Sequence, residues 1–398
     1  MKSLIEEWKY VAGSKFLLTI FIGPLIAALF FGLMFSKNQI SKSPVIVIDE
    51  DHSAYSRQLI SKMNASQYMK VTNVIANRMD PETLLANEQA VAVIMLPNQL
   101  ELRKLQGKSS NIGILMDNTM PSGLMGIRTA IQEILTTENM TLSMTRLGQS
   151  GMDAETAKGH ISPLSLQQRM LFNPTTSYVD FMVLGFVNII VLMMTTSAAG
   201  SIAPRLRKER KLLANGVSPV QLWVRSVPYS VLSTFSLILS YGLLKQVGNM
   251  RFEAETYLFI IPLLVYSFAL SLMGILIGYT AKDTSKVGSR TSLVLYPSFL
   301  ATGIQLTPLA FPMFFQVTAW ALPMNWLNRL IRGMAFRHGS LTAYSLEIGA
   351  LLVIIGVASL LIGLLMLREA RKTNSPVEQR QIPAFYPSAI KTEEPTTC

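Results

Sequence analysis

Cysteine, histidine and charged residues are all scarce in this chain of 398 residues. It has one cysteine, Cys398, and three histidines, His52, His160 and His338. A single cysteine excludes an internal disulfide, and we interpret it as a bystander. Only 15% of the residues are charged, whereas a soluble globular protein carries about 25%. With 50% hydrophobic residues, the composition instead indicates a membrane protein.

Several catalytic and nucleotide-binding motifs are also missing. The sequence contains no G-x-x-x-x-G-K-[ST], no G-x-S-x-G, no H-E-x-x-H and no paired-cysteine site. It has no basic stripe interleaved with aromatic residues, so nucleic acid is not an expected partner. We therefore predict a protein that is not an enzyme and that holds no cofactor and no metal.

Six apolar runs are long enough to cross about 30 Å of hydrocarbon as helices. The fifth run has 38 residues and four prolines, so we expect one crossing to about Phe311 and then a re-entrant region over 312–336. The predicted fold is an α-helical integral membrane protein with six transmembrane helices, the first over 16–36 and five more within 179–367. The runs are 16–35, 181–203, 226–244, 256–281, 291–328 and 348–367.

Basic residues predict which side of the membrane each loop faces. The loop 204–225 holds six Lys or Arg and one acid, and basic residues also follow the fourth and the last runs. These regions share a side with the N-terminus, which predicts a cell-membrane protein with both termini cytoplasmic, including the tail 368–398. Residues 1–15 read as an amphipathic helix on the inner face. One segment disagrees, because Arg329, Arg332 and Arg337 would lie outside.

The stretch 37–178 between the first two spans has soluble character. Residues 37–175 hold 13 Lys or Arg and 12 Asp or Glu, so most of the net charge of +11 lies elsewhere. β-rich runs alternate with helix-favouring ones, which predicts an extracytoplasmic α/β domain. Asp49, Glu50 and Asp51 follow the first predicted strand and precede His52. A solvated turn and a metal site both remain open for them. The expected strands are 44–49, 69–75, 89–97 and 111–117, and a long helix is expected over 121–147.

The predicted spans contain no Asp, Glu, Lys, Arg or His. A charge at the bilayer centre costs about 2.5–3.5 kcal/mol on insertion scales, and ion-driven carriers keep such residues because their mechanism needs them. If the chain moves a solute uphill, the energy must enter through its cytoplasmic loops from a partner. A receptor or adhesion protein and a secondary carrier remain as alternatives.

Some span residues are candidates for specific roles. Polar side chains could line a translocation path or could form interhelical hydrogen bonds. Gly274 and Gly278 form a G-x-x-x-G pair that permits close helix contact. The candidate path residues are Asn188, Thr195, Thr196 and Gln305.

The order of these elements resembles the permease subunits of ABC-2 type transporters over nearly the whole chain. PVIVIDEDHSAYSRQLI and AVAVIMLPNQLELRKLQGK resemble the outward domain of that family, and ERKLLANGVSPVQLWVRS resembles its cytoplasmic coupling segment. The resemblance implies two permeases in the lipid bilayer, identical or paralogous, driven by two separate ABC ATPase subunits. It assigns ATPase coupling to Glu209, Arg210 and Gly216, with the N-terminal helix as a second contact. It also implies export of drugs, antibiotics or lipid-like molecules, and the family includes a sodium exporter.

Overall fold

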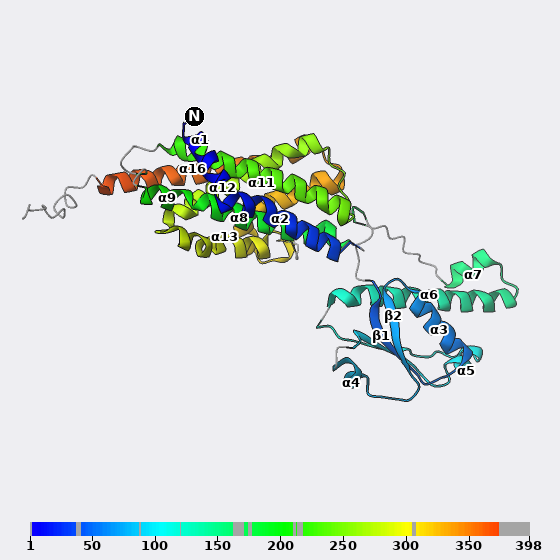
Figure 1. The fold of residues 1–398 in the computed structure, drawn as a ribbon. Coiled ribbons are helices and arrows are strands. Elements are labelled where there is room, and N and C mark those ends of the chain that lie inside the picture. Colours follow the sequence, from blue (N-terminus) through cyan, green and yellow to red (C-terminus); the bar gives the residue numbers. More distant parts are fainter. Residues whose placement is uncertain are drawn as a thin grey trace, which may run out of the picture. The chain divides into compact units, whose positions relative to one another are not determined.

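The computed structural model of this chain is mostly helical and divides into two units (Figure 1). The helical unit comprises Met1–Met34 and Val179–Cys398, and the α/β unit comprises Phe35–Tyr178. The structure describes residues 2–36, 41–86, 89–119, 121–161, 171–173, 177–209, 212, 218–304 and 308–373.

The α/β unit contains a four-stranded sheet in the order β2-β1-β3-β4. β1 is parallel to both of its neighbours, and β4 is antiparallel to β3. A bulge between Val45 and Ile46 interrupts the pairing of β1 with β2. The strands are β1 (Ser43–Asp49), β2 (Met69–Ile75), β3 (Ala92–Leu96) and β4 (Gly113–Met116).

Helices cover both faces of this sheet. On one face, Val45 and Val47 of β1 pack in a core with residues of α3, α5 and α6. On the other face, Ile46 and Ile48 pack against the smaller helix α4. Because successive strand residues point to opposite faces, the continuous apolar run of β1 is explained by burial on both sides. The helices are α3 (Ala54–Ala65), α4 (Pro81–Ala86), α5 (Leu100–Leu105), α6 (Pro121–Gln149) and α7 (Ala154–Ile161).

Two helix starts in this unit follow from capping residues. The Ser53 hydroxyl accepts a hydrogen bond from the Ser56 backbone N–H, so Ser53 caps α3. Asp80 accepts from the Glu82 N–H at 3.2 Å, immediately before Pro81 begins α4. The predicted strands over 44–49 and 69–75 match β1 and β2 within one residue, whereas β3 and β4 are shorter than predicted.

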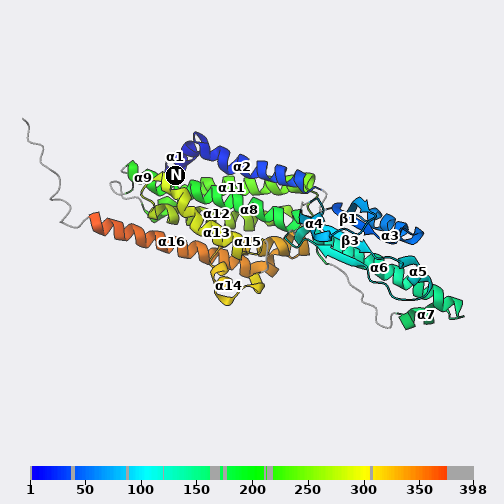
Figure 2. The same ribbon diagram turned by 90° about the horizontal axis from the view of Figure 1, so that it is seen from below.

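The helical unit is built around α8, α11 and α12. α12 packs against α8, α11 and α16, and α11 packs against α2. In Figure 2, α2 and α16 flank the unit with α8, α11 and α12 between them. In the most apolar stretch of α2, and likewise of α16, only 22% of the residues are buried. In the continuous helix formed by α8 and α9 the share is 67%. The long helices are α2 (Lys15–Met34), α8 (Leu184–Gly200), α11 (Pro219–Val247), α12 (Thr256–Thr280) and α16 (Ser345–Thr373).

Five helices in the described part of the chain are long and apolar enough to span a membrane. They correspond to the first, second, third, fourth and last predicted runs. The fifth predicted crossing is represented by α13 (Val287–Ala301), which has 15 residues and ends before Thr302. A helix rises 1.5 Å per residue, so α13 is about 22 Å long and falls short of the hydrocarbon thickness.

Shorter helices complete the helical unit. α1 (Lys2–Ala12) precedes α2 as expected for the amphipathic segment, and α9 (Ile202–Lys208) continues α8 after Ser201. Within the predicted re-entrant region, α14 (Met313–Trp320) and α15 (Pro323–Leu330) are separated at Ala321 and Leu322, because Pro323 begins a new helix. A π-helical turn over Ile331–Phe336 follows α15.

Candidate functional site

The predicted coupling loop begins where α9 ends. Glu209 is exposed at the C-cap of α9, where its backbone N–H donates to the Arg205 carbonyl at 3.0 Å. The other two predicted coupling residues, Arg210 and Gly216, lie outside the described residues. Ser218 caps the next helix, since its hydroxyl accepts from the Gln221 N–H, and α11 then starts at Pro219. The geometry thus fixes both ends of the loop.

A carboxylate on α1 connects these two ends. The Glu7 side chain is fully buried. An Arg205 guanidinium nitrogen lies 2.6 Å from both Glu7 carboxylate oxygens, and an Arg225 nitrogen lies 2.8 Å from one of them. The Tyr229 hydroxyl donates to the same carboxylate at 2.8 Å. One residue of α1 therefore binds α9 on one side of the loop and α11 on the other.

The charges in this cluster balance. Arg225 also pairs with Glu6 at 2.8 Å, so two arginines face two carboxylates. The Arg205 guanidinium lies 3.6 Å above the Tyr10 ring centre, a cation–π contact that adds a further tie to α1. Burying an unpaired charge is costly, whereas a paired and hydrogen-bonded one is tolerated. We call Glu7, Arg205 and Arg225, with the exposed Glu6 at their edge, the buried ion cluster.

The buried ion cluster was not predicted from the sequence. The apolar positions 4, 5, 8 and 11 predict only that residues 1–15 form an amphipathic helix on the inner face. Glu7 follows Leu4 by three residues and precedes Val11 by four, so it shares their helix face. A carboxylate on the apolar face of an amphipathic helix was the available signal. Its partners are about 200 residues away in the chain and gave no local signal.

Arg207 ties α9 to two further helices. Its guanidinium pairs with Glu369 of α16 at 3.0 Å, and it donates to the backbone carbonyls of Tyr279 and Ala281 at the end of α12. These carbonyls are at a helix C-terminus, where cations are favoured by the helix dipole. Through Arg205 and Arg207, α9 is thus bonded to residues of α1, α12 and α16, and the buried ion cluster adds α11. A displacement of α9 would be transmitted to all of these helices.

The predicted path residue Asn188 takes part in a buried chain of hydrogen bonds. The Tyr241 hydroxyl donates to the side-chain oxygen Oδ1 of Asn188 at 2.6 Å. The side-chain nitrogen Nδ2 of Asn188 lies 3.4 Å from Oδ1 of Asn328. Asn328 in turn donates to the Thr302 carbonyl at 3.0 Å. These bonds link α8, α11, α15 and the end of α13. The interhelical alternative therefore accounts for the Asn188 side chain.

Thr195 and Thr196 lie further along α8. Both are fully buried, and neither hydroxyl has a hydrogen-bond partner among the described residues. Gln305 lies outside the described residues. The three described path residues, Asn188, Thr195 and Thr196, all lie on α8, where Asn188 and Thr195 are seven residues apart and share a face of the helix.

The glycine pair of α12 faces α8. A Cβ atom at Gly274 would lie 2.5 Å from the Thr196 carbonyl oxygen, and one at Gly278 would lie 1.9 Å from the Gly200 carbonyl oxygen. No side chain fits at these distances, so the two helices touch through their backbones. The contact is made within the chain, where it holds α12 against the end of α8.

Of the three arginines that disagree with the charge rule, Arg329 and Arg332 make contacts within the helical unit. The Arg329 guanidinium lies 5.4 Å from the Trp326 ring centre and 3.9 Å from Glu347. Arg332 donates to the Gly303 carbonyl at 3.2 Å. Both side chains are thus engaged by neighbouring groups of the helical unit.

The acids after β1 act as hydrogen-bond acceptors for backbone groups. Asp49 accepts from the N–H groups of Asp51 and His52 at 3.1 Å. Asp51 accepts from the N–H groups of Leu100 and Glu101, which begin α5. This geometry favours the turn interpretation. In the ranges that the structure describes, no three His, Cys, Asp or Glu side chains are grouped so that they could hold a metal.

Together, the long apolar helices and a loop held at both ends are typical of a multi-helix membrane transport protein. A profile of the ABC-2 family transporter proteins matches residues 14–365, and the chain belongs to this family. It is 23% identical over 345 residues to the inner membrane transport permease YhhJ of Escherichia coli (strain K12), covering 84% of this chain and 87% of that protein. The YhhJ permease of Shigella flexneri shows the same identity and coverage.

Proposed function

We propose that the chain is the membrane permease subunit of an ATP-driven exporter. Two separate ABC ATPase subunits would supply the energy, and a second permease, identical or paralogous, would complete the passage. The substrate class we propose is drug-, antibiotic- or lipid-like, moved outward across the cell membrane. The observation that carries this proposal is the family match over 14–365, supported by relatives named as transport permeases.

The proposed topology has six transmembrane helices, with α13 as a short crossing that α14 and α15 supplement. The α/β unit would be extracytoplasmic and both termini cytoplasmic. The basic residues near the end of α9 support this orientation, because Lys and Arg concentrate on the cytoplasmic side. The largely exposed apolar faces of α2 and α16 support contact with lipid or with the second permease.

In the proposed mechanism, the ATPase binds the loop 204–225 and displaces it. Glu209, Arg210 and Gly216 would form the contact. Since Glu7 bonds both Arg205 and Arg225, the two ends of the loop would move together with α1. Arg207 would carry the same displacement to α12 and α16. The chain needs no nucleotide site of its own for this role.

The path residues enter the mechanism in different ways. We assign Asn188 to helix packing because both of its amide atoms are hydrogen-bonded. Thr195 and Thr196 have unpartnered hydroxyls, so a shift of α8 could present them to a solute at little cost in lost hydrogen bonds. Gln305 remains a proposed path residue from its position in the sequence.

The test is coupled ATP hydrolysis in proteoliposomes containing the tagged chain and the ATPase that co-purifies with it. Glu209→Ala and Gly216→Pro should each lower permease-stimulated hydrolysis at least about tenfold. Loss of one charge-assisted contact costs about 1.4 kcal/mol or more, which corresponds to a tenfold change. Glu82→Gln, on α4 of the other unit, is the matched control and should leave hydrolysis unchanged.

Three results would overturn the proposal. Unchanged stimulation in both loop variants would remove the coupling role. Hydrolysis of ATP by the purified chain alone would show that it carries its own nucleotide site. Transport that follows an ion gradient after ATP depletion would indicate a secondary carrier. Deleting 44–170 separates a receptor from a permease, because only a permease would retain ATPase stimulation.

A further inference from the structure

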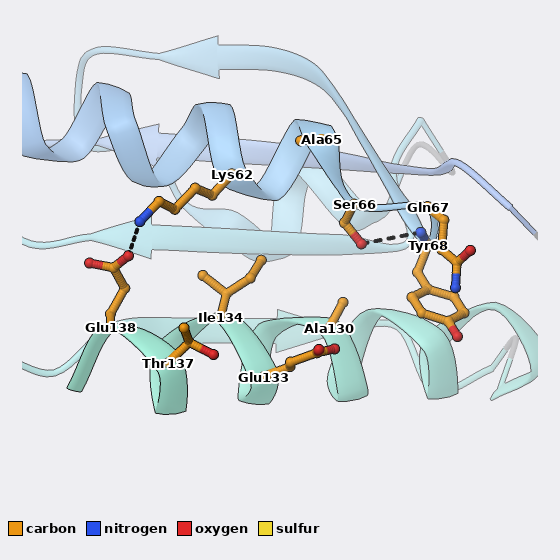
Figure 3. A pocket seen from close by; sticks show the side chains of 10 residues that line it. All are labelled: Lys62, Ala65, Ser66, Gln67, Tyr68, Ala130, Glu133, Ile134, Thr137 and Glu138. Carbon is orange, nitrogen blue, oxygen red and sulfur yellow. Dashed lines mark hydrogen bonds and ion pairs between the residues drawn. The ribbon is translucent and has the colours of Figure 1, made fainter. Parts of the chain in front are cut away.

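The α/β unit contains an open cavity of about 450 Å³ between α6 and the segment that joins α3 to β2 (Figure 3). This volume is within the range of small-molecule sites in proteins, about 300–1,000 Å³. Apolar side chains form much of its wall: Ala65 at the end of α3, and Ala130 and Ile134 on α6. The cavity lies within one unit, so its shape depends only on contacts inside that unit.

At one end of the cavity the charges are compensated. Lys62 of α3 forms an ion pair with Glu138 of α6, as Figure 3 shows. Glu138 is 8% exposed and also accepts a hydrogen bond from the Tyr55 hydroxyl at 3.2 Å. This ion pair lies at one end of the cavity and contributes no net charge to it.

At the other end a carboxylate is left over. Glu133 lines the cavity, is exposed, and forms no hydrogen bond or ion pair with any residue that the structure describes. In Figure 3 its carboxylate extends along α6 toward the end of the cavity that holds Tyr68. With Lys62 bound to Glu138, the charged groups of the lining sum to one negative charge, located at Glu133.

The Tyr68 ring is held at this end by a close contact with α6. A Cβ atom at Gly126 would lie 2.7 Å from a ring carbon of Tyr68, so only glycine permits the ring to lie this close to the helix. The Tyr68 backbone N–H donates to the Ser66 hydroxyl at 3.2 Å, which orders the turn that carries the ring. The π-face of such a ring attracts cations within about 6 Å.

We propose that this cavity binds an organic cation with an apolar body, its ammonium group lying between Glu133 and the Tyr68 ring. The apolar body would pack against Ala65, Ala130 and Ile134. An anion is disfavoured because the one cationic side chain of the lining, Lys62, is already paired. The site does not depend on the proposed transport function, since both of its walls belong to the α/β unit.

The probe is benzyltrimethylammonium, titrated by calorimetry into the full chain in uncharged detergent. Neopentylbenzene is the matched neutral compound, because a carbon atom replaces the nitrogen at nearly the same size. We expect the cation to bind at least about fivefold more tightly than the neutral compound, and its affinity to fall as salt rises. Equal binding of the two compounds, or no saturable binding of the cation, would overturn the proposal.

Variants localise the site. Glu133→Gln should weaken binding about fivefold by removing the charge, and Tyr68→Leu should do so by removing the π-face. Tyr68→Phe retains the π-face and should bind as the parent does. Glu82→Gln removes an exposed carboxylate from α4, on the opposite face of the sheet, and should change nothing. Thermal unfolding of each variant establishes that it is folded. Unchanged affinity in folded Glu133→Gln would show that the cation binds elsewhere and would contradict the assignment.

Discussion

Two buried carboxylates, Asp49 of the α/β unit and Glu7 of the helical unit, are held in different ways. In the α/β unit, Asp49 accepts hydrogen bonds from residues two, three and seven positions later in the chain. In the helical unit, Glu7 is bonded to Arg205 and Arg225, 198 and 218 residues later. The first arrangement relies mainly on neutral backbone donors within one turn. The second relies on opposite charges brought together by the fold of the whole unit.

The difference has an energetic consequence. A capping bond to a neutral backbone donor contributes about 1 kcal/mol, and its loss leaves no charge without a partner. Removing one member of a buried ion pair costs about 3–5 kcal/mol, because the partner charge is left without compensation. The helical unit should therefore be more sensitive to loss of Glu7 than the α/β unit is to loss of Asp49. The same long-range bonds are what would make its helices move together.

The largest expected effect is that of Glu7→Gln. The change removes the charge that faces Arg205 and Arg225 inside the protein, so we expect a loss of about 3–5 kcal/mol in the free energy of unfolding. Denaturant unfolding of the chain in mild detergent measures it. In proteoliposomes, ATPase coupling should fall with it, because the charged bonds from Glu7 to both loop ends are lost, and α1 keeps only the exposed Glu6–Arg225 pair and the Tyr10–Arg205 contact.

Glu6→Gln is the matched control for that variant. Glu6 is the adjacent carboxylate and pairs with the same Arg225, but its side chain is 57% exposed. Exposed ion pairs contribute about 0–1 kcal/mol, so the change should be small. Equal losses in the two variants would mean that burial does not distinguish these carboxylates, and the contrast between the units would fail.

The second effect concerns backbone packing in the helical unit. In Gly278→Ala, the added methyl group would meet the Gly200 carbonyl, forcing α12 away from α8 at a cost of about 1–3 kcal/mol. Gly363→Ala on α16 has nothing within 4 Å of the new Cβ atom. It should be neutral or stabilising by up to about 1 kcal/mol, because alanine favours helix. Thermal unfolding of both variants provides the comparison, and a stable Gly278→Ala would contradict the close contact.

The α/β unit was predictable from sequence in much of its detail because its signals are local. The β-branched runs predicted β1 and β2 within one residue, and Ser53 and Asp80 are residue types that favour the start of a helix. The apolar runs likewise predicted the five long helices. The buried ion cluster was not predicted, because pairing of Glu7 with Arg225 depends on how α1 packs on α11. The short α13 was overestimated, since absence of charge does not show where a helix ends.

A third prediction tests the weaker contacts of the α/β unit. Asp51 caps α5 through the N–H groups of Leu100 and Glu101, so Asp51→Ala should cost about 0.5–2 kcal/mol. Glu50→Ala is the neighbouring control. Glu50 lies 3.9 Å from Arg78, whose side chain is 91% exposed, so its loss should stay within about 0.5 kcal/mol. Proteolysis of the folded chain near α5 reports the local loss. Equal cleavage in both variants would argue against the cap.

The smallest effect is a pH dependence that originates in the α/β unit. Burial, reinforced by the negative charge of Glu138, raises the pKa of Tyr55 to about 12, against about 10 in an unfolded chain. Because the folded pKa is the higher one, this contribution to stability is complete below pH 10 and is lost as the pH rises toward 12. Tyr55→Phe cannot ionise, so its stability should fall less between pH 9 and 11.5 than that of the parent. An equal loss of stability in the parent and in Tyr55→Phe between about pH 9 and 11.5 would show that the surroundings do not hold the phenol neutral. The buried Glu138 would then not raise the pKa of Tyr55 as the geometry implies.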